Sequence, residues 1–184
     1  MTITVRRSGT TDLGAILALM QEARGEGLSH EEKAERGFVQ GRMDEAMLAG
    51  LQEGSGVFVA EEDGSFAGFA VTSSPVLFTS GPAKETVDAV SALAPDDSRF
   101  FLYGPVAVDR RFQGRGVMTA LLKSLCRDLV DDYDLGSAFV EVTNAKSLAV
   151  HRHYGMTEAA HFTIDDREYA VFTFEPSAFA KRTD

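Results

Sequence analysis

The sequence has little of several features, and each absence excludes a class of protein. Cys126 is the only cysteine in 184 residues, so no internal disulfide can form, and a secreted, disulfide-stapled domain is excluded. No stretch approaches the roughly 18 apolar residues of a membrane-spanning helix. The first ten residues lack the apolar core of a signal peptide. We therefore expect a cytoplasmic protein without a membrane partner. Because Cys126 occupies an apolar position of a helical pattern, we expect it to be a buried, inert thiol.

Positive charge is also scarce. The chain has 18 Lys and Arg against 28 Asp and Glu, a formal net charge of -10 at pH 7. Nucleic-acid binding usually demands a broad basic face, so we expect no nucleic-acid partner. The 44% of hydrophobic residues is ordinary for a globular protein, and the length suits one domain over residues 1–184.

The spacing of apolar residues predicts alternating strands and helices. Strands are expected at residues 3–7, 56–62, 66–72, 100–108 and 137–142, and in a hairpin over 157–174. Helices are expected from residue 13, from Ser29, over an exposed segment at 82–93, over 117–130, and between Asn144 and Tyr154. This order predicts an α/β protein whose mixed sheet has helices on both faces.

Two local patterns predict where elements begin and turn. Ser29 is followed three residues later by Glu32, the capping-box pattern of a helix start. Asp165, Asp166 and Arg167 lie between two strand patterns, which predicts the turn of the last hairpin.

The strand at 100–108 contains an internal contradiction. It is nearly all apolar, as in a strand covered on both faces, yet Gly104 and Pro105 fall inside it. Because proline cannot donate to a sheet ladder, a regular central strand is disfavoured at this point. We expect the sheet to open beside residues 104–106.

The strand at 100–108 leads into a helix through a glycine-rich, basic turn. Gly114 and Gly116 lack a Cβ, and the first helical turn has free backbone N–H groups that favour an anion. Arg110, Arg111 and Arg115 add positive charge to an otherwise acidic chain. The pattern predicts a phosphate site.

The turn and a second block together resemble the GNAT superfamily of acetyl-CoA-dependent N-acetyltransferases. The family's phosphate motif, Gln/Arg-x-x-Gly-x-Gly/Ala, fits here in two registers, from Arg111 or from Gln113. We prefer Gln113-x-x-Gly116-x-Met118, which keeps the family's spacing from the strand but has Met118 where the family has Gly or Ala.

The second block begins at Asn144 and reads Asn-x-x-Ser-x-x-x-His-x-x-x-Gly-Met. It is similar to the family's Asn-x-x-Ala/Ser, Tyr and Gly-Phe block after the fifth strand. His151 stands where many relatives carry tyrosine, and Met156 stands in place of phenylalanine.

The resemblance implies a mostly antiparallel central sheet of about seven strands, opened between the fourth and fifth, in a single domain. It implies transfer of an acetyl group from acetyl-CoA to a primary amine by direct attack. The cofactor-binding residues it implies are Val106, Val108, Gln113, Gly114, Arg115, Gly116, Val117, Met118, Asn144 and Ser147.

Catalysis would need a proton donor for the departing thiolate and a base for the amine. His151 has a reference pKa of about 6.5 and is our general-acid candidate, with Tyr154 and Tyr103 as alternative hydroxyl donors. Each of the three could instead be structural. Glu141 is a candidate base, because apolar neighbours raise a carboxyl pKa, although strand alternation could equally point it to solvent.

The partner expected from the resemblance is a small-molecule or peptide amine, and a homodimer is compatible with the family. No metal is expected, because His151 and His153 are two apart and do not share a helical face. A rival reading is a non-catalytic sensor that binds acyl-CoA without turnover. A Rossmann-type nucleotide domain fits less well, because the glycine motif comes late in the chain.

Overall fold

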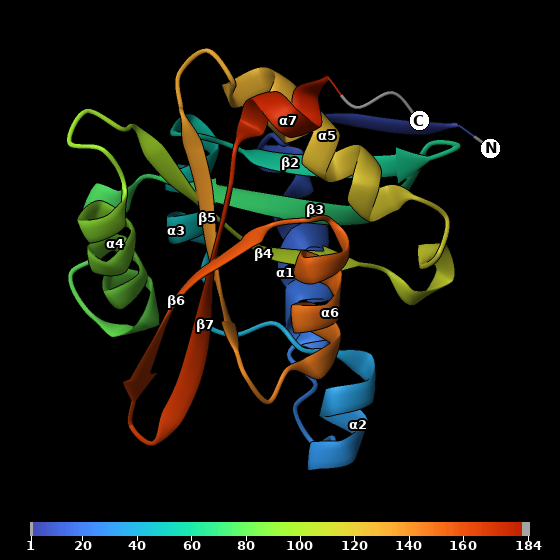
Figure 1. Ribbon diagram of the computed structural model, residues 1–184. Helices are drawn as coiled ribbons and strands as arrows, with labels where there is room; N and C mark the ends of the chain where they lie inside the picture. Colours follow the sequence, from blue (N-terminus) through green and yellow to red (C-terminus); the bar gives the residue numbers. More distant parts are fainter. Residues whose placement is uncertain (1, 182–184) are drawn as a thin grey trace.

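The computed structural model describes residues 2–181, which form a seven-stranded mixed sheet flanked by helices (Figure 1). The strands are β1 (Ile3–Arg7), β2 (Val57–Glu62), β3 (Ser65–Ser73), β4 (Phe100–Val108), β5 (Leu135–Glu141), β6 (Thr157–Ile164) and β7 (Arg167–Phe174). The α-helices are α1 (Leu13–Ala23), α2 (His30–Arg36), α3 (Glu45–Glu53), α4 (Gly81–Leu93), α5 (Val117–Leu129), α6 (Ala145–His153) and α7 (Pro176–Ala180).

The strand order is β1-β2-β3-β4-β5-β7-β6. All neighbouring strands are antiparallel except β4 and β5, which pair in parallel. The predicted fold class, a mostly antiparallel sheet of about seven strands with helices on both faces, is therefore confirmed.

The predicted opening in the sheet lies between β4 and β5. The two strands pair only from Phe100 opposite Leu135 to Leu102 opposite Ser137, among the residues that the structure describes. Beyond this short ladder β4 follows β3, while β5 turns away with β7 (Figure 1). The irregularity expected at Gly104 and Pro105 is present, because the β3–β4 register shifts between Ala70 and Thr72. The strands thus diverge toward their carboxyl ends.

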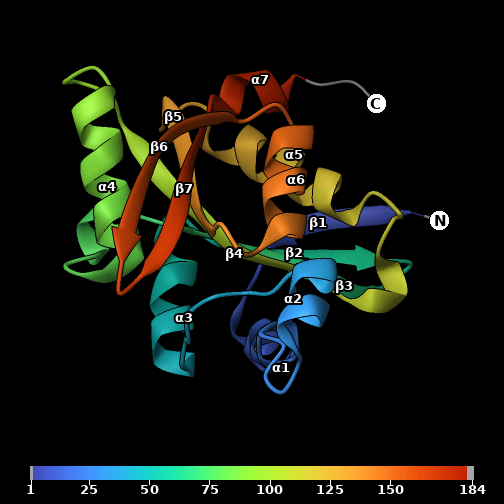
Figure 2. The same ribbon diagram turned by 60° about the horizontal axis from the view of Figure 1, so that its bottom comes forward.

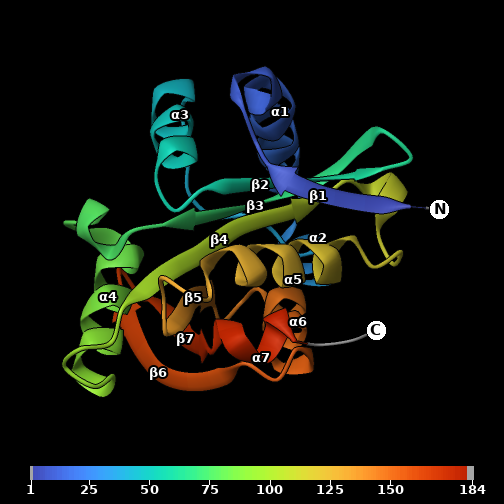
Figure 3. The same ribbon diagram turned by 90° about the horizontal axis from the view of Figure 1, so that it is seen from above.

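Helices cover both faces of the sheet. In the view of Figure 3, α1 and α3 lie on one side of β1–β4, and α5 lies on the other. One apolar stripe of α5 is buried, and Cys126 lies within it: the buried side chains are Val117, Leu121, Leu122, Leu125, Cys126 and Leu129. A second core cluster joins α1 and α3 to the opposite face of β2 and β3.

Residues 82–93 form a helix, as predicted, but the prediction that this helix is exposed is wrong. The helix α4 forms, but it packs against β5, β6 and β7 and buries Thr86 and Val90 (Figure 2). The α4 face with Leu93, by contrast, is exposed.

The local patterns are confirmed. Ser29 Oγ accepts a hydrogen bond from the Glu32 N–H at 3.2 Å, and the Glu32 carboxylate accepts one from the Ser29 N–H at 2.8 Å. Asp165 and Asp166 adopt φ angles of 48° and 61° at the β6–β7 turn, as a two-residue hairpin turn requires.

Candidate active site

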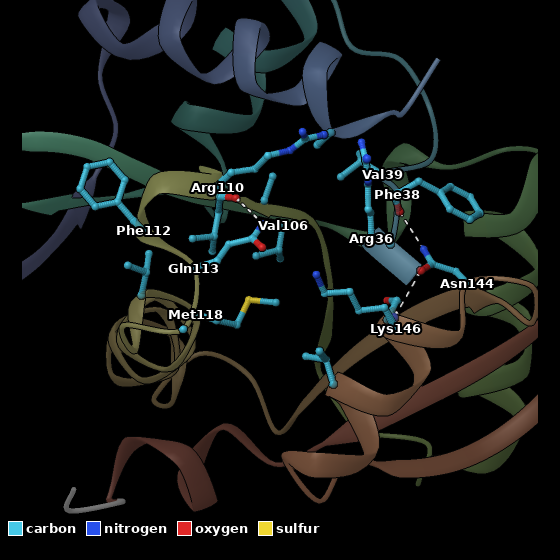
Figure 4. Close-up of a pocket in the computed structure, with 18 of the residues that line it drawn as sticks. Arg36, Phe38, Val39, Val106, Arg110, Phe112, Gln113, Met118, Asn144 and Lys146 are labelled. Atoms are coloured by element: carbon cyan, nitrogen blue, oxygen red, sulfur yellow. Dashed lines mark hydrogen bonds between the residues drawn. The ribbon is translucent and has the colours of Figure 1, made fainter. Parts of the chain in front are cut away.

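A cavity of about 980 Å³ lies where β4 and β5 separate. Its walls come from α1, the segment after α2, the end of β4, the start of α5 and one side of α6 (Figure 4). The volume is at the upper end of the roughly 300–1,000 Å³ typical of ligand sites, which suits an extended ligand.

The glycine-rich turn forms one end of this cavity. Gly114 and Gly116 line it and have φ angles of 75° and 89°, a left-handed conformation that other residues adopt only under strain. Gly116 is the N-cap of α5 and has no side chain, so nothing on it covers the free N–H groups of the first helical turn. The helix start is therefore open to an anion.

The three arginines of the turn are each held by an acid of the protein. Arg111 Nη2 lies 2.7 Å from Asp109 Oδ2, and this pairing lowers the pKa of the Asp109 carboxyl. Arg110 Nε lies 3.7 Å from Glu22 Oε1. Arg115 donates to Glu62 at 3.0 Å, and the Glu62 side chain is only 3% exposed. Arg110 lines the cavity, while the Arg115 guanidinium is turned to Glu62, outside the cavity lining. The predicted contact of Arg115 with a cofactor stays a prediction.

The end of β4 presents main-chain groups to the cavity. The Asp109 N–H donates to Ala67 of β3, so by strand alternation Val108 and Val106 direct their backbone groups to the open side. The Gln113 amide confirms this direction for Val108, because its Nε2 donates to the Val108 carbonyl at 3.2 Å. Val106, Val108 and Gln113 all line the cavity (Figure 4).

Met118 lies in the first turn of α5 and extends its side chain into the cavity (Figure 4). Its sulfur is 3.9 Å from the Tyr103 hydroxyl, which lies deeper in the core. Burial raises the pKa of Tyr103 far above its ordinary value, so this phenol keeps its proton. The Met118 side chain separates Tyr103 from the cavity lining.

Asn144 joins two walls of the cavity. Its Oδ1 accepts from the Ser147 N–H at 3.3 Å and caps α6, while its Nδ2 donates to the Phe38 carbonyl at 2.8 Å. Asn144 is therefore the N-cap of α6. Asn144 and Ser147 also line the cavity, as their predicted cofactor role requires.

Tyr154 lies at the end of α6 and lines the cavity opposite the start of α5. Its hydroxyl is 2.9 Å from Thr119 Oγ1, which also lines the cavity. The geometry brings a phenolic proton to the open cleft.

His151 lies on α6, four residues after Ser147, but it is not among the residues that line the cavity. Its ring packs against Phe172, with centroids 5.0 Å apart, and its Nδ1 is 2.7 Å from the Ser147 carbonyl. Because a carbonyl only accepts, Nδ1 carries the proton and Nε2 is an acceptor. Burial lowers the pKa of His151, with partial opposition from that hydrogen bond. The ring is thus neutral at pH 7.

Glu141 also lies outside the cavity lining, at the end of β5. Its Oε2 accepts from Gln40 Nε2 at 2.5 Å, and its Oε1 accepts from Thr143 Oγ1 at 2.5 Å. Both carboxylate oxygens are therefore engaged by the protein. The acid role of His151 and the base role of Glu141 stay predictions.

Several cavity residues were not predicted from the sequence. They are Arg36 at the end of α2, Phe38 and Val39 after it, Thr119 on α5, and Lys146 and His153 on α6. Thr119 follows Gly116 by three residues on a helix, a spacing that would have placed it on the same face. The helical pattern that begins at Ser29 was expected to continue weakly through Phe38, but α2 ends at Arg36. The position of Phe38 and Val39 depends on tertiary contacts that the sequence does not reveal.

Metal-ligating groups are not gathered in this region. Within residues 2–181, no cluster of three or more His, Cys, Asp or Glu side chains is arranged to hold a metal ion. Over the same residues, no helix has the length and apolar character needed to cross a membrane.

Solved structures share the fold at low sequence identity. An N-acetyltransferase from Staphylococcus aureus Mu50 matches with a TM-score of 0.63 and 20% identity, over 96% of this chain and 99% of that one. The protein yncA from Salmonella typhimurium, solved with its cofactor acetyl-CoA, matches with a TM-score of 0.64 and 17% identity, over 96% and 95%. The ribosomal-protein-S18-alanine N-acetyltransferase from Escherichia coli matches with a TM-score of 0.60 and 19% identity, over 95% and 94%.

This chain therefore has the fold of these solved N-acetyltransferases. The family model of the acetyltransferase (GNAT) family matches residues 15–156, and the chain belongs to this family. A comparison with curated proteins found no match.

Proposed function

We propose that this enzyme transfers the acetyl group of acetyl-CoA to a primary amine by direct attack, without a covalent enzyme intermediate. The observation that supports this most strongly is that one cavity joins the open start of α5 to the gap between β4 and β5. A ligand with a diphosphate at one end and a thioester at the other fits this shape.

The residues that would hold acetyl-CoA come from both sides of the gap. The diphosphate would rest on the N–H groups at the start of α5, next to Gly114 and Gly116. The pantetheine amides would pair with the main chain at Val106 and Val108 and with Asn144. The Val106 and Val108 groups face the cavity, which supports this arrangement.

Tyr154 is the residue that we propose as proton donor to the departing thiolate. It combines an ionisable hydroxyl with a place on the cavity wall, whereas His151 is packed against β7. A thiolate whose conjugate thiol has a pKa of about 8.5 is a good leaving group. Proton donation by Tyr154 would therefore account for only part of the rate of acetyl transfer.

Turnover with a panel of amines tests the proposal. The wild-type protein is expected to release free CoA thiol from acetyl-CoA only when an acceptor amine is present, with N-acetylated product in equal amount. Acetyl-CoA binding without turnover on amino acids, small amines or peptide N-termini would contradict the transferase and favour an acyl-CoA sensor.

A further inference from the structure

The segment between Gly37 and Gly41 forms a wall of the cavity away from the glycine-rich turn. Gly37 and Gly41 have φ angles of 74° and 83°, so the chain bends at both ends of the segment. Phe38 and Val39 line the cavity between them. If acetyl-CoA lies on α5 as proposed, this wall faces the acceptor amine, and the inference below rests on that placement.

Three consecutive residues attach this segment to the rest of the molecule. The Phe38 carbonyl accepts from Asn144 Nδ2 at 2.8 Å, and the Val39 N–H donates to the Ala23 carbonyl at 3.0 Å. Gln40 Nε2 donates to Glu141 Oε2 at 2.5 Å. Two of the three attachments therefore come from residues at or just after the end of β5.

Glu141 has the contacts of a fixed acceptor of hydrogen bonds. Besides Gln40, it accepts from Thr143, and Arg167 Nη1 lies 3.9 Å from the same Oε2 that receives Gln40. Its side chain is only 13% exposed. A carboxylate with both oxygens engaged and no place on the cavity wall is badly placed to take a proton from a bound amine.

We propose that Glu141 is a positioning residue, which holds Gln40 and thereby fixes the Gly37–Gly41 segment as the wall of the acceptor site. Asn144 secures the same segment two residues earlier. Glu141 and Asn144, at and just after the end of β5, thus both hold the wall of the acceptor site, and Asn144 also lines the cavity on the proposed cofactor side.

Steady-state kinetics of three variants test this role. In Glu141→Ala, Gln40→Leu and the double variant, we expect the KM for the amine to rise about tenfold, as expected for loss of a hydrogen bond to a charged group. The two single effects should not add, because both remove the same contact. The KM for acetyl-CoA and the shape of the pH–rate profile should stay as in the wild type.

The conservative variant Glu141→Gln separates positioning from base catalysis. Its amide oxygen can still accept from Gln40 and its amide nitrogen can donate to Thr143, so the amine KM should return toward the wild-type value. A base role predicts the opposite: kcat falls about a hundredfold or more in Glu141→Gln, while Gln40→Leu behaves as wild type. That result would overturn the proposal. Glu168→Ala, which removes an exposed carboxylate on the neighbouring strand, is the matched control.

Amide hydrogen exchange gives a readout that does not depend on finding the amine. Residues 38–41 should exchange faster in both Glu141→Ala and Gln40→Leu, but not in Glu168→Ala. Unchanged exchange in the first two variants refutes the positioning role. A wild-type protein without turnover on any amine contradicts the proposed function instead, and exchange still decides the role of Glu141.

Discussion

Two tyrosines near the start of α5 differ in what they can reach. Tyr154 lines the cavity beside Thr119, whereas Tyr103 is buried behind Met118 and keeps its proton because burial raises its pKa. Tyr154 is therefore placed for the chemical role that we propose, whereas Tyr103 packs in the core.

For Tyr154→Phe we predict a fall in kcat of about a hundredfold, the lower end of general acid effects, because a thiolate is a good leaving group. The affinity for acetyl-CoA should change little, since the ring remains. Isothermal titration and steady-state kinetics measure the two quantities. Tyr103→Phe is the control and should keep kcat near wild type; equal losses in both variants would refute the assignment.

His151 predicts how stability depends on pH. Burial holds its folded-state pKa below the ordinary value of 6.5, so between these two pKa values the unfolded chain binds more protons. The free energy of unfolding should therefore fall as the pH drops through 6.5 toward the folded pKa.

Replacing His151 with Phe removes this titration and keeps a ring against Phe172. Urea unfolding at pH 7.5 and pH 5.5 should show a smaller loss of stability for His151→Phe than for the wild type. Equal losses in the two proteins would mean that His151 does not titrate in this range.

Cys126 gives a simple test of the core. Burial raises the pKa of its thiol to about 12, and none of its surface is exposed. The folded protein should not react with a thiol reagent at pH 8, and the unfolded protein should show one reactive thiol. Rapid reaction of the folded protein would contradict the packing of α5.

The start of α5 is the element on which cofactor binding depends in the function that we propose. Gly116→Glu would place a side chain on a residue with a φ of 89° and add negative charge where the diphosphate is expected. We predict at least a hundredfold weaker acetyl-CoA binding by titration calorimetry, because the new carboxylate would repel the diphosphate and its side chain would block the N–H groups at the helix start.

Gly64→Glu serves as the matched control for Gly116→Glu. Gly64 has a similar φ of 79°, with open space around it, in the β2–β3 turn. This variant should lose stability to a similar degree but bind acetyl-CoA normally. Wild-type affinity in Gly116→Glu would refute the phosphate position.

Strands, capping boxes and turns were predictable from sequence because their signals are local. The β6–β7 turn at Asp165 and Asp166 and the start of α2 at Ser29 both match the expected patterns. The break in β4 was predictable because proline cannot pair within a ladder. The five-residue helix α7 had no periodic signal and was not predicted.

Partners distant in sequence were not predictable. The α4 periodicity indicates an apolar face but not that β5, β6 and β7 lie beneath it. Three arginines in one turn suggested a cationic site, yet Arg110 and Arg115 pair with the distant acids Glu22 and Glu62. Glu141 likewise has an apolar sequence context, while its contact with Gln40 spans 101 residues of sequence.

The whole sheet consists of two halves joined by a short parallel ladder. One half is β1 to β4, and the other is β5, β7 and β6. Helices pack on both halves, so each has its own support where the strands separate (Figures 1 and 3). The gap between the two halves leaves main-chain groups of β4 facing the cavity, where they are available to an extended ligand.

The most direct test of this account is a titration of ¹⁵N-labelled protein with acetyl-CoA, followed by amide chemical shifts. We predict the largest changes at residues 106–108 on β4 and 114–119 at the start of α5, with little change at β1 and at the β6–β7 turn. Saturable binding with those two segments unperturbed would contradict the central claim that the diphosphate rests on α5 and the pantetheine lies in the gap beside β4.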